Sequence, residues 1–123
     1  MRHAFIALFL MIGSQAGAAT KDAELRGSIM MLASYLGFSE YCSAYGIEYQ
    51  RLANEIIRGF KENATQQDKR YLTDFERAVI KGNLGYLYSP KADRYVDMPK
   101  EGADPYQTCK MAHQTVLKVS KAK

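Results

Sequence analysis

Two cysteines and one histidine carry most of the reactive chemistry that this sequence offers. Cys42 and Cys109 are its only cysteines, and His113 follows Cys109 by four residues, which places both side chains on one face of a helix. A structural zinc site needs four ligands, and this pair supplies two. A Cys–His nucleophile pair would need the cysteine as a free thiolate. We therefore expect no metal site and no thiol catalysis here.

A disulfide is the role that suits the two cysteines better. In an oxidising compartment Cys42 and Cys109 would have only each other as disulfide partners. The alternative is a pair of reduced or redox-active thiols, but no C-x-x-C spacing supports it. Closing so long a loop contributes about 4 kcal/mol in the chain-entropy model. The sequence therefore predicts a structural Cys42–Cys109 bridge.

Other catalytic patterns are missing from the sequence. Serine catalysis would need His113 as the base and a carboxylate to orient it. Neither a Gly-x-Ser-x-Gly motif nor a glycine-rich phosphate loop before a helix occurs. The carboxylates of the expected helices fall at polar positions, where nothing adapts them to acid–base work. We predict that the protein is not an enzyme and holds no cofactor.

The N-terminus has the three parts of an export signal. A positive start at Arg2 is followed by nine apolar residues, 4–12, and then by the small residues Ala16-Gly17-Ala18. An apolar run of that length is too short to span a bilayer, which takes about 20 residues. We predict a signal peptide over residues 1–19, cleaved after Ala18 or one residue later, and a periplasmic or secreted domain over 20–123. The alternative is a buried N-terminal helix. No second long apolar run occurs, so we expect no transmembrane segment in the mature chain.

Apolar periodicity predicts four helices that position these residues. The first covers residues 22–42, and the second, over 47–63, has the cleanest amphipathic pattern. The third begins after a capping Thr65 and ends at Gly82, the residue expected to take a positive φ. Its expected buried side consists of Tyr71 or Leu72, Phe75, Val79 and Ile80.

The fourth helix has the clearest start. Asp104 can cap it, Pro105 suits the first helical position, and Gln107 completes an Asp-x-x-Gln box. Both cysteines then lie on inward helix faces. The expected fold class is all-α, a compact four-helix bundle whose last helix is joined to its first by the disulfide.

The segment over residues 82–103 has no helical period and is rich in tyrosine. Two alternating runs, one with Tyr86 and Tyr88 and one with Tyr95, allow a short hairpin. Irregular segments this long are usually functional or disordered, and aromatic content argues against disorder. Tyrosine is favoured at recognition surfaces. Tyr86, Tyr88 and Tyr95 are therefore the candidate partner-binding residues, and the alternative is that their rings cover an open end of the core.

The charge pattern of the chain argues against nucleic acid as a partner. The chain has 17 Lys and Arg against 13 Asp and Glu, interleaved over most of its length, which is unlike the basic stripe of a nucleic-acid-binding protein. Four lysines without an acid follow from Lys110 onward. They complement a helix dipole or form a patch for an acidic partner.

These features predict an exported, non-catalytic accessory or binding protein that acts through a protein partner. The layout of signal peptide, small helical body and one disulfide is similar to that of periplasmic acid-stress chaperones and of immunity proteins against secreted cell-wall amidases. An inhibitor or immunity protein implies one tight partner and a rigid contact surface. A stress chaperone implies broad binding after unfolding, and an enzyme would need a deep pocket lined by carboxylates.

Overall fold

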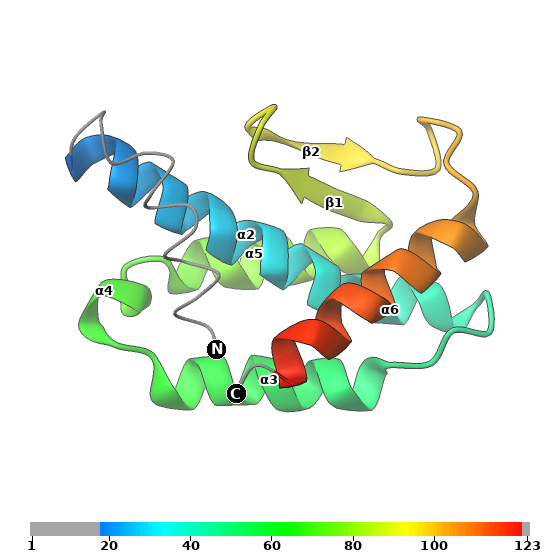
Figure 1. Ribbon diagram of the computed structural model, residues 1–123, viewed down its shortest axis with the longest axis horizontal. Helices are drawn as coiled ribbons and strands as arrows, with labels where there is room; N and C mark the ends of the chain where they lie inside the picture. The colour runs from blue at the N-terminus through cyan, green and yellow to red at the C-terminus, as the bar shows by residue number, and fades with distance from the viewer. Residues whose placement is uncertain (1–17, 122–123) are drawn as a thin grey trace.

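The computed structural model describes residues 18–121 of the chain, except for the side chains of residues 18–20, 67 and 68 (Figure 1). Apart from its last two residues, the predicted signal peptide lies outside the described part. The elements in chain order are α2 (Ala18–Ser43), α3 (Gln50–Asn63), α4 (Gln66–Lys69), α5 (Leu72–Asn83), β1 (Tyr86–Ser89), β2 (Arg94–Asp97) and α6 (Pro105–Lys121).

Helix α2 is the central element because its apolar residues surround it rather than forming one stripe. A helix that is apolar all round must be covered on several sides. Helices α3, α5 and α6 and strand β1 all pack against α2 (Figure 1). Leu36, Phe38 and Cys42 in its C-terminal half are fully buried. The core of the protein is therefore built around the first predicted helix.

Helices α2 and α5 run side by side in the same direction and touch through two glycines. A Cβ atom on Gly37 of α2 would lie 1.9 Å from the carbonyl oxygen of Val79 in α5. A Cβ atom on Gly82 would lie 2.2 Å from the carbonyl oxygen of Ser34. Only glycine allows two backbones to approach this closely. These contacts fix both the spacing and the rotation of α5 against α2.

Helix α3 carries the chain back from the end of α2 toward the start of α5. Its buried residues are Ala53, Ile56 and Phe60, one turn apart, as the amphipathic pattern predicts. The Phe60 ring stacks on Phe75 of α5, with 4.1 Å between ring centres. At its start, the Tyr49 hydroxyl donates a hydrogen bond of 2.9 Å to the Tyr35 carbonyl oxygen.

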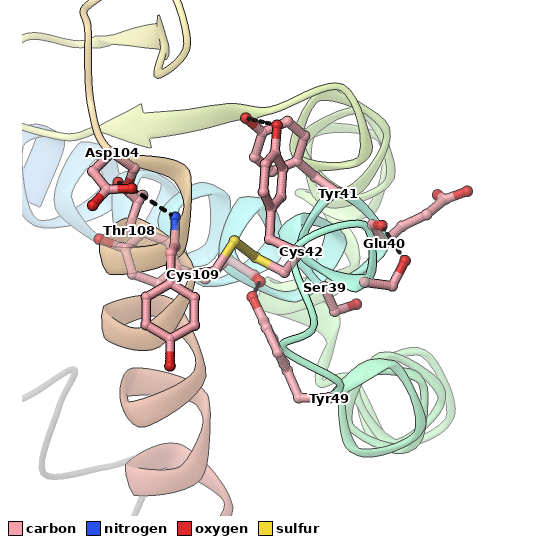
Figure 2. The surroundings of a disulfide bond; sticks show 12 residues. Ser39, Glu40, Tyr41, Cys42, Tyr49, Asp104, Thr108 and Cys109 are labelled. Atoms are coloured by element: carbon pink, nitrogen blue, oxygen red, sulfur yellow. Dashed lines mark hydrogen bonds between the residues drawn. A yellow bond between two sulfur atoms is a disulfide. The ribbon is translucent and has the colours of Figure 1, made fainter.

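The predicted disulfide joins the last turn of α2 to the first turns of α6 (Figure 2). The Cα atoms of Cys42 and Cys109 are 5.6 Å apart, and both residues are fully buried. The start of α6 is also as predicted, because the Asp104 carboxylate accepts a hydrogen bond from the backbone N–H of Tyr106 at 3.2 Å. The Thr108 hydroxyl donates to the Asp104 carbonyl oxygen at 2.9 Å.

The chain is mostly helical, but the all-α prediction was wrong in one respect. Strands β1 and β2 form an antiparallel two-stranded sheet with Tyr88 opposite Tyr95, so the hairpin allowed by the alternating residues is confirmed. The hairpin rests on α2, where the backbone N–H of Tyr88 donates to the Ser34 hydroxyl at 3.0 Å. The turn out of α5 takes its positive φ at Gly85 (96°) and not at Gly82 as predicted.

The third predicted helix also differs from the structure. It is split into α4 and α5, and Ile80, expected on the buried side, is 59% exposed. Ala78 and Gly82 face α2 together with Phe75, because the glycine contact brings this side of α5 inward. Ile80 precedes Gly82 by two positions, which is more than half a turn of helix, and its side chain therefore points away from α2.

Candidate functional site

The three tyrosines predicted to bind a partner lie together in the structure. Strand pairing sets Tyr88 opposite Tyr95, and their rings meet edge to face with 5.3 Å between centres. The Lys81 ammonium of α5 lies 5.1 Å from the ring centre of Tyr86 and 5.7 Å from that of Tyr95. Tyr86, Tyr88 and Tyr95 thus form one cluster beside α5.

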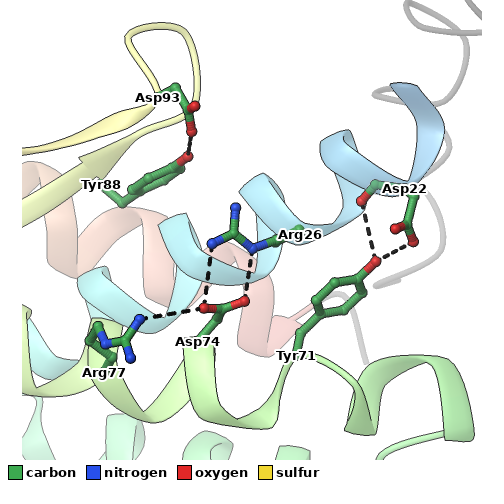
Figure 3. Close-up of polar contacts among 7 residues, drawn as sticks. All are labelled: Asp22, Arg26, Tyr71, Asp74, Arg77, Tyr88 and Asp93. Carbon is green, nitrogen blue, oxygen red and sulfur yellow. Dashed lines mark hydrogen bonds and ion pairs between the residues drawn. The ribbon is translucent and has the colours of Figure 1, made fainter. Parts of the chain in front are cut away.

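Tyr88 is the most tightly packed member of this cluster. It is only 6% exposed, and its hydroxyl hydrogen-bonds the carboxylate of Asp93 (Figure 3). Burial and the bond to Asp93 raise the pKa of Tyr88 to about 12. Tyr86 and Tyr95 are half-buried. Within the cluster these two rings, and not Tyr88, offer surface to another molecule, and their role in binding stays a prediction.

Ion pairs tie the N-terminal halves of α2 and α5 together. The guanidinium of Arg26 contacts both carboxylate oxygens of Asp74, at 2.8 and 3.4 Å (Figure 3). This hydrogen-bonded pair raises the pKa of Arg26. Arg77 reaches the same carboxylate only at 3.8 Å and keeps 61% of its side chain exposed. Asp74 is therefore engaged mainly by Arg26, and Arg77 remains a surface cation.

A second contact of this kind lies at the start of the two helices. Arg70 pairs with Asp22 at 3.2 Å. The Tyr71 hydroxyl hydrogen-bonds the Asp22 carboxylate (Figure 3). Exposed pairs of this type contribute about 0–1 kcal/mol each. They align α2 and α5 but supply little of the stability.

The outward side of α5 changes character along its length. Its first exposed positions, Thr73 and Glu76, are polar, while the later ones, Ile80 and Leu84, are 59% and 63% exposed. Leu84 is the residue that directly follows α5, and its φ of −91° and ψ of 0° stay close to helical values, so it continues the helical spacing of four residues from Ile80. Among the described residues, these are the two most exposed large apolar side chains.

Two cations lie on the same side of α5 as this aliphatic pair. Their spacing from Ile80 and Leu84 follows the i, i+3, i+4, i+7 rule, which puts all four residues on one helix face. We refer to these four residues as the α5 face: Arg77, Ile80, Lys81 and Leu84. The rings of Tyr86 and Tyr95 adjoin it at Lys81.

A hollow lies between the start of α3 and α6. It has a volume of about 610 Å³ and is lined by Glu48, Tyr49, Gln50, Arg51, Leu52, Glu55 and His113. The His113 ring stacks on Tyr49 with 5.1 Å between centres, and burial raises the pKa of Tyr49. Because the Tyr49 hydroxyl already donates to a backbone carbonyl, this pair is engaged in packing. Among the side chains of residues 21–66 and 69–121, no three from His, Cys, Asp or Glu are grouped as metal ligands.

The sequence interpretation missed the α5 face because it assigned Ile80 to the buried side of the third helix and ended that helix at Gly82, before Leu84. The pattern that could have revealed it is the alternation of cation and aliphatic residue at helical spacing over 77–84. If Gly82 is interpreted as a residue in contact with α2 rather than as the end of the helix, the side of α5 that carries Ile80 is predicted to be exposed.

Comparison with known proteins does not assign the chain to a family. It matches no family model, no curated protein and no solved structure. No helix in residues 18–121 is long and apolar enough to cross a membrane. Function must therefore be inferred from the chain's own residues.

Proposed function

We propose that this chain is an exported, non-catalytic binding protein that acts on a protein partner through the α5 face. The observation that carries the proposal is the exposure of two large aliphatic side chains, Ile80 and Leu84, four residues apart at the C-terminal end of α5. Single exposed apolar side chains are common on folded proteins, but adjoining ones with a polar rim are typical of interaction sites.

The surroundings of this pair resemble the composition of a protein interface. Interface centres are apolar and enriched in aromatic residues and arginine. On the α5 face the aliphatic pair is accompanied by Arg77, and the half-buried rings of Tyr86 and Tyr95 lie next to Lys81. Two of the three tyrosines predicted from the sequence, Tyr86 and Tyr95, thus supply the aromatic edge of this surface.

Export is supported by two independent features. The first is the signal-like sequence of residues 1–19. The second is the Cys42–Cys109 disulfide, which suits a periplasmic or secreted protein because such bridges persist in oxidising compartments.

Among the kinds of binding protein, a specific inhibitor or immunity protein fits better than a stress chaperone. The α5 face lies on a helix held against α2 by backbone contact at Gly37 and Gly82, and α2 is bridged to α6. A surface fixed in this way is organised before binding, which reduces the entropy lost when one partner docks. A chaperone would instead need a surface that adapts to many clients.

Capture from the envelope fraction of exporting cells tests the proposal. We expect the immobilised protein to retain one partner, and Ile80→Ser/Leu84→Ser to retain at least about tenfold less, since interface anchors contribute roughly 1–2 kcal/mol each. The control is Tyr106→Ser/Met111→Ser on α6, whose residues are 47% and 40% exposed, and it should retain as much as the native chain. Equal retention by the Ile80/Leu84 variant contradicts the proposal.

A further inference from the structure

We infer that the α5 face selects an acidic partner: a protein segment whose carboxylates meet Arg77 and Lys81 while an aliphatic side chain packs on Ile80 and Leu84. This inference rests on the proposed function, because it specifies the chemistry of the partner at the same surface. It depends on which charges near the face are already neutralised within the chain.

Arg77 is a cation without a close carboxylate of its own. The carboxylate nearest to it, Asp74, is contacted on both oxygens by Arg26, and Arg77 reaches it only at 3.8 Å. Its planar guanidinium suits a carboxylate, which it can bind through two parallel hydrogen bonds. An incoming acid can therefore form a contact with Arg77 that the folded chain does not provide.

Lys81 is held in place by rings rather than by an acid. Its ammonium lies over Tyr86 and Tyr95, and no carboxylate among the described side chains, which are those of residues 21–66 and 69–121, is within ion-pair distance of it. The acid across the strand pair from Tyr86 is Asp97, which accepts a hydrogen bond from the backbone N–H of Lys100 at 3.3 Å. The rings fix the position of the cation by cation–π attraction but leave its charge uncompensated.

The other carboxylates around the face already have partners. Glu76, one turn before Ile80, pairs with Lys61 of α3 at 3.1 Å. Asp93 in the hairpin is hydrogen-bonded by Tyr88. A hydrogen bond from a neutral tyrosine leaves the charge of Asp93 in place, but the α5 face itself carries two cations, Arg77 and Lys81, and no carboxylate around its apolar centre. Electrostatic complementarity of this kind speeds encounter, excludes like-charged partners and weakens as salt is added.

Two synthetic helical peptides with the same length and leucine spacing test the inference. One has glutamates flanking its leucines and the other has lysines. We expect fluorescence anisotropy to show at least about tenfold tighter binding of the glutamate peptide, with a loss of affinity at about 0.5 M salt.

Variants of the protein locate the effect. Arg77→Gln/Lys81→Met keeps much of the side-chain volume and should weaken the glutamate peptide at least about fivefold, the loss of one to two exposed charge contacts. Lys110→Gln/Lys118→Gln on α6 removes the same charge from exposed positions elsewhere and should leave binding unchanged.

The outcomes separate this inference from the function on which it rests. If both peptides bind equally and Ile80→Ser/Leu84→Ser abolishes binding, the face binds apolar groups without selecting acids, and the inference is wrong while the proposed function stands. Failure of the glutamate peptide to bind at about 1 mM also overturns the inference. If the partner captured from cells is still retained by Arg77→Gln/Lys81→Met at the native level, the acidic chemistry is likewise excluded.

Discussion

Replacing Gly37 or Gly82 by alanine is expected to lower the free energy of unfolding by about 3 kcal/mol or more, because the new methyl group has nowhere to go. The Cβ atom would lie 1.9 Å from the Val79 oxygen at the first site and 2.2 Å from the Ser34 oxygen at the second. Both obstacles are backbone atoms, so relief requires α2 and α5 to move apart. Urea unfolding of the exported form, followed by circular dichroism, measures the loss.

Gly27→Ala is the matched control on α2. Its Cβ atom would meet only the Pro90 side chain at 3.6 Å and a Tyr88 ring carbon at 4.0 Å, which are ordinary contacts. Because alanine has the higher helix propensity, this variant should be unchanged or up to about 1 kcal/mol more stable. If Gly37→Ala behaves like Gly27→Ala, the helices do not touch at the glycines and the orientation of the α5 face loses its basis.

Removing the disulfide is also expected to cause a large loss of stability. Cys42→Ala/Cys109→Ala opens a bridge between residues 67 apart, which the chain-entropy model values at about 4 kcal/mol. For a chain of this size that corresponds to a melting temperature lower by about 20 °C. Differential scanning calorimetry of the exported protein measures the shift.

Reduction and alkylation check the same bridge by another route. A reductant should lower the melting temperature of the native protein and leave that of Cys42→Ala/Cys109→Ala unchanged. Alkylation of the unfolded, unreduced protein should label neither Cys42 nor Cys109. Quantitative labelling of both would show that the bridge does not form in the exported protein.

Local patterns were enough to predict the parts of the fold that depend on neighbouring residues. The capping Asp104 marks the start of α6, and the apolar stripe of α3 identifies its buried side. The pairing of Cys42 with Cys109 could be predicted without a structure, because two cysteines allow only one disulfide. The cap and the apolar stripe each depend on residues close together in the sequence, and the disulfide has only one possible pairing.

The parallel contact of α2 with α5 could not be predicted in the same way. Glycine adds nothing to an apolar stripe, so hydrophobic periodicity does not mark Gly37 and Gly82 as the place of closest approach. With Gly82 interpreted as a helix end, Ile80 joined the expected core, although it is 59% exposed. The rotation of α5 is a tertiary effect that outweighs the local pattern.

The sequence predicted which tyrosines belong to the cluster but not how their rings are arranged. Spacing indicated that Tyr86, Tyr88 and Tyr95 belong together, and strand pairing brings them together. The sequence left open whether these rings contact a partner or cover the core, and it did not single out Tyr88 as the buried one or indicate that Lys81 would lie over the other two rings. Lys81 comes from a different element, and its position depends on how α5 meets the hairpin.

Photo-crosslinking in intact exporting cells tests most directly whether the α5 face binds a protein. A benzophenone amino acid placed at Leu84, and in a second strain at Met111 of α6, compares two positions that are 63% and 40% exposed. The proposed function predicts one discrete protein adduct at Leu84 and none of that mass at Met111. An adduct of the same yield at Met111, or no discrete adduct at Leu84, would contradict it.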